Sequence, residues 1–242
     1  MRVCILTVGS RGDVQPYVAL ARSLERAGHR TAVCASPAYR SFIESYGVEY
    51  ACVDTGDPQV LLRSPEGQAI FRSTRNPLAL LQGLCRLLEP VLEKGYAEAC
   101  QVSADADALL VAPGALPIAQ ALNESRDLPF ASAFLQPNHP TREFGCWLFP
   151  DPPAWLPFRG RLRRASYQLT WQMLYRIVRG ANDAARRNVL GLGPGVNPFA
   201  AMLQERWPTL YGISSSVLPR PADWGPELEL TGYWFLDRPS GW

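Results

Sequence analysis

The first half of the chain alternates between apolar runs and segments with helical periodicity. Val3–Val8 is a continuous apolar run, as expected of a strand covered on both faces, and Tyr17–Gly28 carries apolar residues at helical spacing until its final glycine. Four more strands are predicted at Thr31–Ala35, Val48–Val53, Ala108–Ala112 and Pro129–Leu135. Strands joined by helices need right-handed crossovers, so residues 1–136 are predicted to form an α/β fold with a doubly wound parallel sheet.

Three further helices are predicted between these strands. One begins at Pro37 and ends at Gly47, one carries the apolar face Leu81–Leu92, and one includes Ile118–Leu122. Pro90 lies inside the second of these and lacks the amide that a helix interior needs, so a kink or a break is expected there. Residues 55–76 show no periodicity and are expected to be irregular.

The segment Gln136–Arg159 is rich in both proline and large apolar side chains. Six prolines keep it out of regular helix or sheet, whereas residues such as Phe144, Trp147 and Phe149 make it too apolar for a solvated linker. The segment is therefore expected to pack against another part of the protein or against a ligand. Either it packs as a loop on its own domain, or it forms a wall of a pocket for a bulky apolar ligand.

A long helix is predicted over Arg161–Arg187, and its apolar residues at helical spacing are Leu162, Leu169, Met173 and Ile177 on one face beside Tyr167, Trp171, Leu174 and Val178. Between Arg159 and Arg187 the chain holds eight arginines and a single acidic residue. This surface is either a solvated basic face or a peripheral contact with anionic lipid.

The end of the chain contains two further predicted strands, Leu210–Ile213 and Leu228–Trp234. The closing segment, 237–242, is short, polar and contains proline and glycine, and it resembles the start of an interdomain linker. We therefore expect one domain over residues 1–236.

Composition narrows the function classes. The 242 residues carry a formal charge of +2, which gives no overall bias toward nucleic acid. The six cysteines have no CxxC spacing and the two histidines no metal-ligand spacing, so neither a disulfide framework nor a metal site is expected. No secretory leader and no apolar run long enough to span a membrane are seen, which predicts a cytoplasmic protein.

The turn after the first strand is the strongest candidate site. Residues 9–16 (GSRGDVQP) place backbone amides and the carboxylate of Asp13 where open α/β sheets bind ligands. Asp13 is suited to accept a proton from a hydroxyl nucleophile, and it is equally suited to cap the following helix. Arg11 is placed to pair with that carboxylate or with a phosphate, or to point to solvent.

Common catalytic motifs are missing around this turn. The spacing of Gly9 and Gly12 does not match the G-x-G-x-x-G dinucleotide fingerprint, and neither a P-loop nor a G-x-S-x-G elbow occurs. A nucleotide-dependent oxidoreductase domain is therefore disfavoured. His139 follows the fifth predicted strand and is a candidate ligand contact at the edge of the sheet.

The sequence around this turn also resembles a known protein family, and the resemblance suggests a function that motif spacing alone does not. The run TVGSRGDVQPYVALA at residues 7–21, followed by Leu24, Ala27-Gly28-His29 and Gly47-Val48-Glu49-Tyr50, resembles the N-terminal domain of GT-B glycosyltransferases. The group it resembles is the sterol 3-beta-glucosyltransferase-like one, with its bacterial relatives that glycosylate glycopeptides and rhamnolipid precursors. Thr231-Gly232-Tyr233-Trp234 is similar to the end of that domain. The resemblance implies a Rossmann-like fold that binds the acceptor, while a C-terminal domain binds a nucleotide sugar.

The resemblance also assigns roles to residues. It implies inverting transfer of a hexose, from a donor such as UDP-glucose, to a hydroxyl of an apolar acceptor (a sterol, lipid or secondary metabolite), with Asp13 as the base and no cofactor besides the nucleotide sugar. The residues implied near the donor phosphates are Gly9, Ser10, Arg11 and Gly12. The residues expected around the acceptor are Gly114, Gln136, His139, Phe144, Trp147 and Phe149.

The sequence departs from the family pattern in one respect that bears on activity. The glycine- and histidine-rich donor signature of the family's C-terminal domain does not occur in these 242 residues. The chain is therefore expected to be inactive without a donor-binding domain. The alternative is a non-catalytic module or helper subunit that holds an apolar acceptor.

Overall fold

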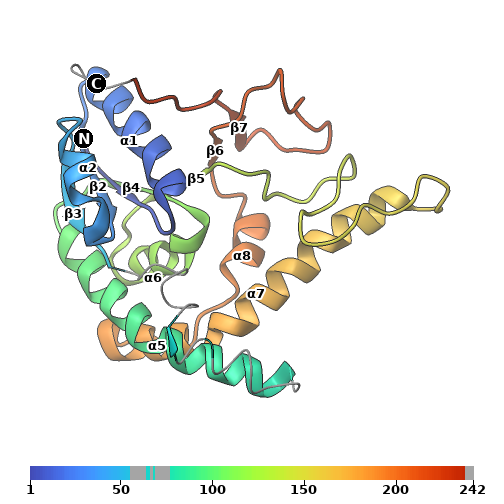
Figure 1. Ribbon diagram of the computed structural model, residues 1–242, viewed down its shortest axis with the longest axis horizontal. Coiled ribbons are helices and arrows are strands. Elements are labelled where there is room, and N and C mark those ends of the chain that lie inside the picture. The colour runs from blue at the N-terminus through green and yellow to red at the C-terminus, as the bar shows by residue number, and fades with distance from the viewer. Residues whose placement is uncertain (55–63, 66–67, 69–76, 238–242) are drawn as a thin grey trace.

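The computed structural model describes residues 1–54, 64, 65, 68 and 77–237 (Figure 1). Most of the segment expected to be irregular, 55–76, and most of the expected linker, 237–242, lie outside the described residues. The elements in chain order are β1 (Arg2–Leu6), α1 (Arg11–Arg26), β2 (Arg30–Ala35), η1 (Pro37–Tyr39), α2 (Arg40–Glu44), β3 (Glu49–Cys52), α5 (Pro77–Val102), β4 (Ala108–Val111), η2 (Pro113–Ala115), α6 (Leu116–Arg126), β5 (Phe130–Phe134), α7 (Arg159–Leu190), α8 (Pro198–Glu205), β6 (Thr209–Tyr211) and β7 (Leu228–Leu230).

A single sheet joins the seven strands in the order β3-β2-β1-β4-β5-β6-β7, and every pair is parallel. The predicted doubly wound parallel sheet is confirmed, and so are the two strands predicted near the end of the chain. The strand order reverses between β1 and β4, which makes the carboxyl ends of these two strands the topological switch point.

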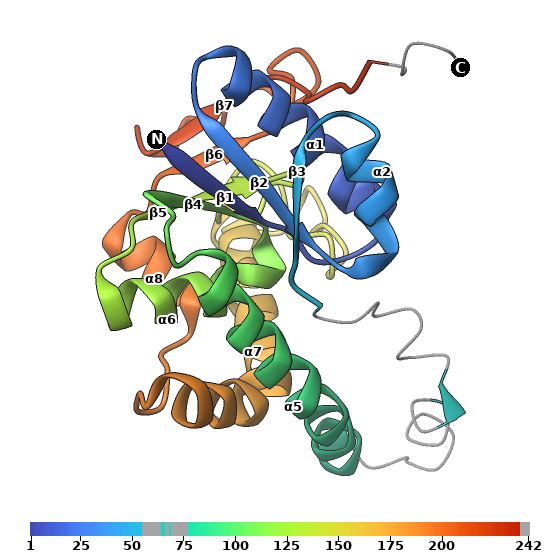
Figure 2. The ribbon, with the colours of Figure 1, turned by 90° about the vertical axis from the view of Figure 1, so that its left-hand side faces the viewer.

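Both faces of the sheet are covered, as the apolar run of the first strand predicts. Val3 and Ile5 of β1 pack toward α1 and α2, whereas Cys4 and Leu6 pack in the core that includes α5 and α6. Successive side chains of a strand point to opposite faces, so a strand between two helical layers must be apolar at every position. Figure 2 shows the sheet between these helices.

Two helix predictions are corrected by the structure. Helix α1 begins at Arg11 rather than at Tyr17, and Pro16 lies inside it. The polar residues before Pro16 form the first turn because Asp13 reaches back to the amide of Ser10, at 2.7 Å. Helix α5 continues through Pro90, so the break considered there does not occur.

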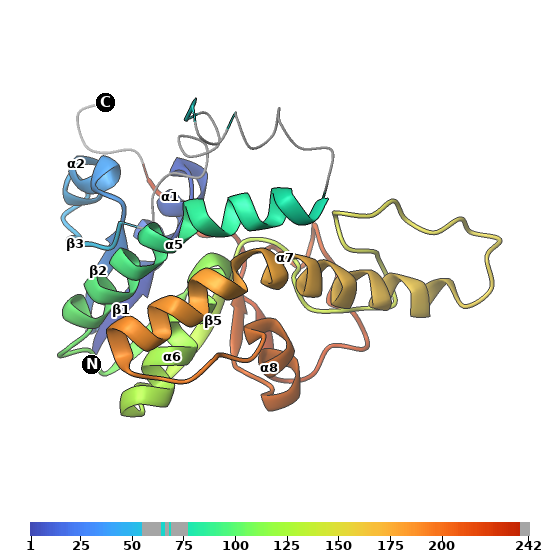
Figure 3. The same cartoon turned by 90° about the horizontal axis from the view of Figure 1, so that it is seen from below.

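Helix α7 extends well beyond the domain at its N-terminal end and packs along α5 at its C-terminal end (Figures 1 and 3). The apolar set predicted for this helix is correct only in part, because Leu162, Leu169 and Met173 are exposed. Tyr167 and Trp171, which belong to the predicted set, are buried, and so is Tyr175, which does not belong to it. The rings of Tyr167 and Trp171 pack with the proline-rich segment and with α8.

One of the eight arginines between Arg159 and Arg187 is buried rather than solvated. Arg186 is 2% exposed; its Nε donates to the carbonyl of Gly193 at 2.9 Å, and its guanidinium pairs with Glu124 at 2.6 Å. A guanidinium this deeply buried needs such partners. No helix among the described residues is long and apolar enough to cross a bilayer.

Helix α8 was not predicted from the sequence. Asn197 caps it by accepting a hydrogen bond from the amide of Phe199 at 3.1 Å, and Pro198 occupies its first position. Asparagine followed by proline is a helix-start signal that could have identified it.

Candidate active site

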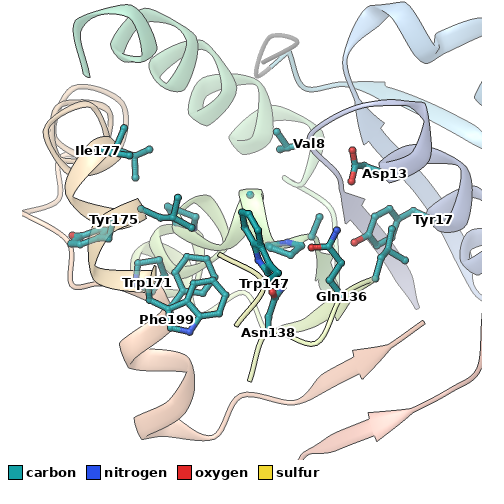
Figure 4. A pocket seen from close by; sticks show the side chains of 18 residues that line it. Val8, Asp13, Tyr17, Gln136, Asn138, Trp147, Trp171, Tyr175, Ile177 and Phe199 are labelled. Carbon is teal, nitrogen blue, oxygen red and sulfur yellow. The ribbon is translucent and has the colours of Figure 1, made fainter. Parts of the chain in front are cut away.

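A pocket of about 400 Å³ opens at the carboxyl edge of the sheet, beside the switch point. One wall comes from the loops after β1, β4 and β5, which contribute Val8, Gly114 and Gln136. The opposite wall comes from α7 and from the start of α8, and it is mostly apolar (Figure 4). Pockets of this size and character usually hold small organic molecules.

Asp13 lines this pocket from the first turn of α1. Its Oδ2 accepts hydrogen bonds from the Ser10 amide at 2.7 Å and from the Ser10 hydroxyl at 2.9 Å. Asp13 is therefore the third helical residue, paired with Ser10 as the N-cap, rather than the N-cap itself. Among the described residues, Oδ1 has no hydrogen-bond donor, which leaves this oxygen for a ligand hydroxyl.

Gly9 makes the position of the Asp13 carboxylate possible. Its φ of +132° is a conformation that L side chains rarely adopt, and a Cβ at this position would lie 2.4 Å from Asp13 Oδ2. Glycine is thus required here both for the backbone turn and for the close approach of the carboxylate.

The remaining residues of the turn lie around the helix N-terminus. Arg11 and Gly12 are exposed, and the Arg11 guanidinium lies over the Phe42 ring, 4.7 Å from its centroid. No ion pair joins Arg11 to Asp13 in the described part of the chain. The amides of the first helical turn remain suited to an anion, and the phosphate-contact roles of Gly9, Ser10, Arg11 and Gly12 stay predictions.

Three of the predicted acceptor residues line the same pocket as Asp13: Gly114, Gln136 and Trp147. Gly114 packs closely on Val8, because a Cβ at Gly114 would lie 3.2 Å from the Val8 Cβ. Trp147 is exposed and stands at the pocket in Figure 4, so the proline-rich segment does contribute to the wall.

The other three predicted acceptor residues do not line this pocket. Phe144 packs with Cys146, Tyr167 and Trp171 in a small apolar cluster. Phe149 lines a separate apolar groove between the proline-rich segment and α7. His139 is buried and contacts rings of the core instead.

His139 is held by hydrogen bonds and ring contacts. Its Nδ1 lies 2.6 Å from the Tyr211 hydroxyl, which also accepts from the His139 amide at 3.0 Å. Its ring lies edge-on to those of Tyr211 and Trp224. Burial lowers the pKa of His139 to about 4, from an ordinary value of 6.5, although Glu227 raises it slightly.

The pKa of His139 predicts an acid-dependent loss of stability. Because the pKa is lower in the folded state, the unfolded chain binds the proton more tightly, and stability is lost as the pH falls from about 6.5 to about 4. The loss should reach about 3 kcal/mol. Urea unfolding at pH 7 and at acidic pH should show a smaller loss for His139→Gln than for the parent chain. Equal losses would mean that His139 is not the titrating group.

Sequence reasoning missed the residues that form the far wall of the pocket. Trp171 stacks on Phe199 with ring centroids 3.9 Å apart, and Val178 extends this wall along α7. Trp171 and Val178 lie on a correctly predicted helix, whereas Phe199 lies on the helix that was not predicted. Tyr17 completes the near wall, with its hydroxyl donating to the carbonyl of Ala133 at 2.6 Å.

Within the described residues there is no group of three or more His, Cys, Asp or Glu side chains able to hold a metal ion.

An all-parallel sheet with helices on both faces makes this a Rossmann-like domain, and an apolar pocket with a carboxylate at its switch point is typical of sites for small molecules. The match to known families is more specific. Residues 3–144 match the glycosyltransferase family 28 N-terminal domain, and the chain belongs to this family.

Curated relatives extend the likeness over the whole chain. It is 34% identical over 248 residues to the sterol 3-beta-glucosyltransferase of Cryptococcus neoformans var. neoformans serotype D, covering 98% of this chain and 14% of that protein. The identity to the sterol 3-beta-glucosyltransferase of Yarrowia lipolytica is 32% over 246 residues, covering 99% of this chain and 16% of that protein. The chain thus spans only a small part of the length of these relatives.

Solved structures show the same fold. The kitacinnamycin glycosyltransferase superposes on 99% of this chain, over 53% of its own, with a TM-score of 0.57 and 16% identity. CalG4, the calicheamicin glycosyltransferase, superposes on 96% of this chain, over 53% of its own, with a TM-score of 0.54 and 14% identity. The chain therefore has the fold of the N-terminal half of a GT-B glycosyltransferase.

Proposed function

We propose that this chain is the acceptor-binding domain of an inverting glycosyltransferase. It holds an apolar alcohol, with a sterol as the leading candidate, while a donor-binding domain presents a nucleotide sugar such as UDP-glucose. The observation that carries the proposal is the Asp13 carboxylate at the edge of an apolar pocket. The sterol 3-beta-glucosyltransferase relatives support the choice of acceptor class.

The proposed reaction uses Asp13 as the general base. The acceptor hydroxyl donates to Oδ1 of Asp13 and attacks C1 of the sugar from the face opposite the nucleotide. The proton passes to the carboxylate, the new C–O bond forms, and the nucleoside diphosphate leaves with the electron pair of the broken bond. The hydrogen bonds from Ser10 to Oδ2 orient the carboxylate for this transfer.

The apolar wall orients the acceptor without fixing its identity. Trp171, Phe199 and Val178 can cover a large rigid hydrocarbon, and such burial depends on area rather than on direction. The near wall supplies the polar end, since Gln136 and Asp13 both line it (Figure 4). The N-terminus of α1 faces the side where donor phosphates are proposed to lie.

Binding measurements on the chain test this division of roles. We expect isothermal titration to show binding of a sterol or another apolar alcohol, and weak or no binding of UDP-glucose. Val178→Trp should fill part of the pocket and weaken acceptor binding by about tenfold or more. Val217→Trp is the matched control, because Val217 is exposed and outside the pocket. Tight UDP-glucose binding, or equal acceptor binding by the two variants, would contradict the proposal.

A further inference from the structure

A protruding arm is the most unusual surface of this molecule. The arm consists of residues 144–173, which comprise the proline-rich segment and the first half of α7, and it extends away from the sheet (Figures 1 and 3). Of the twelve exposed large hydrophobic side chains among the described residues, seven lie on this arm. Trp155 is 79% exposed and Phe158 is 69% exposed. Large apolar side chains exposed in this number on one segment are typical of an interaction surface.

The arm is held in shape by the small apolar cluster of Phe144, Cys146, Tyr167 and Trp171 and, nearer its tip, by ion pairs. Asp151 of the proline-rich segment pairs with Arg163 of α7 at 2.6 Å and also with Arg159. The Arg163 guanidinium donates to the carbonyl of Glu143 at 2.5 Å as well. These contacts join the proline-rich segment to the helix, so the exposed rings are presented on a defined scaffold.

The apolar tip is accompanied by positive charge. Asp151 is already paired, whereas Arg161 and Arg164 are exposed and have no acidic partner in the part of the chain that the structure describes. The Arg161 guanidinium lies 5.2 Å from the centroid of the Phe158 ring. Cations beside exposed aromatic and aliphatic side chains are complementary to a surface that is anionic outside and apolar beneath.

Phe158 adopts a backbone conformation that favours glycine. Its φ is +61° and its ψ is +23°, at the residue where α7 begins. A bulky aromatic residue in the left-handed region is strained, and the ring of Phe158 is nevertheless exposed at the start of α7. The interior of the domain gains nothing from this ring, because the side chain faces solvent.

We propose that the arm docks this protein on a lipid surface that carries anionic headgroups. Trp155 and Phe158 enter the interfacial layer, where aromatic rings are favoured, and the arginines contact headgroup phosphates. Leu162 and Leu169 extend the apolar contact along α7. The proposed lipid contact involves fewer residues than the basic segment 161–187 considered from the sequence. It includes the N-terminal half of α7, which lies on the arm, and excludes the C-terminal half, which packs on the domain.

Docking by the arm would also place the pocket near the lipid. Trp147 and Trp171 belong to the arm and line the acceptor pocket. An apolar acceptor leaving the bilayer would therefore have only a short path to Asp13. The docking itself stands on the exposed rings and arginines and does not require that the chain transfer a sugar.

Vesicle sedimentation tests this proposal. We expect the chain to bind vesicles of phosphatidylcholine and phosphatidylserine about tenfold more tightly than vesicles of phosphatidylcholine alone, and to lose part of this binding at high salt. The double variant Trp155→Ser/Phe158→Gly and the double variant Arg161→Glu/Arg164→Glu should each bind the anionic vesicles about tenfold more weakly. Because glycine relieves the strain at position 158, Phe158→Gly alone should melt no lower than the parent chain.

Matched controls separate docking from general surface effects. Val217→Ser removes an apolar side chain that is 67% exposed elsewhere on the domain, and Arg30→Glu reverses an exposed charge at β2. Both should bind vesicles as the parent does. Equal binding to neutral and anionic vesicles, or unchanged binding by both arm variants, would overturn the proposal. Self-association abolished by the arm variants, without vesicle binding by the parent, would assign the arm to a second copy of this chain instead.

Discussion

Asp13→Asn is expected to lower turnover about 10²- to 10⁴-fold when this chain acts together with a donor-binding domain. The amide cannot take the proton of the acceptor hydroxyl, so the nucleophile must attack without a base. Asparagine keeps an oxygen able to accept from the Ser10 amide, as Oδ2 does now, so the first turn of α1 should remain folded. Steady-state rates of sugar transfer, with acceptor affinity measured by titration, check this prediction.

Ser10→Ala is the matched control for the loss of the base. It removes the hydroxyl that donates to Oδ2 but leaves the carboxylate and the Ser10 amide in place. Turnover should fall by about tenfold or somewhat more, but by less than in Asp13→Asn, since a hydrogen bond to a charged group contributes about 1.5–3 kcal/mol and the carboxylate that takes the proton is kept. Acceptor affinity should be similar in both variants. Equal rates for Asp13→Asn and Ser10→Ala would remove Asp13 from the role of base.

Gly9→Ala should impair the site even though Asp13 is still present. The new methyl group would lie 2.4 Å from Asp13 Oδ2, and the alanine would have to adopt a φ of +132°. Either the backbone turn changes or the carboxylate moves away from Ser10, and both outcomes displace the base. We expect a loss of about 1–3 kcal/mol in the free energy of unfolding and a fall in turnover of about a hundredfold.

Gly28→Ala is the control for Gly9→Ala, because it introduces backbone strain without displacing the Asp13 carboxylate. Gly28 has a φ of +88°, but a Cβ there would meet no atom within 4 Å. This variant should lose stability through backbone strain and keep its turnover, which chemical denaturation and rate measurements can compare directly. If Gly9→Ala and Gly28→Ala turned over at the same rate, the close approach of Gly9 to Asp13 would have no part in the reaction.

Local patterns predicted the part of the site that lies at the sheet edge. The first strand, the following turn and the helix are encoded within residues 2–26, so the position of Asp13 beside backbone amides could be predicted. The same reasoning placed Gly114 and Gln136 at the ends of their strands. These positions depend on strand periodicity and on the rule that parallel strands end at a common edge.

The other residues of the site are determined by packing between segments that are distant in the sequence. His139 follows β5 just as Gln136 does, yet only contact with Tyr211, far along the chain, takes it into the core. Phe199 reaches the pocket because α8 packs beside α7, which no local pattern shows. A periodic pattern predicts which residues share a face of a helix or strand, but not which other element packs against that face.

The sequence by itself determined the parallel α/β architecture, the turn carrying Asp13 and the family, because strand and helix periods and the GSRGD turn are local properties of the chain. Only the tertiary structure decided which side chains share the pocket with Asp13. It also decided that Leu162, Leu169 and Met173 on α7 stay exposed, since burial depends on whether a second element lies opposite each face. Where none does, as on the arm, an apolar face remains open to solvent.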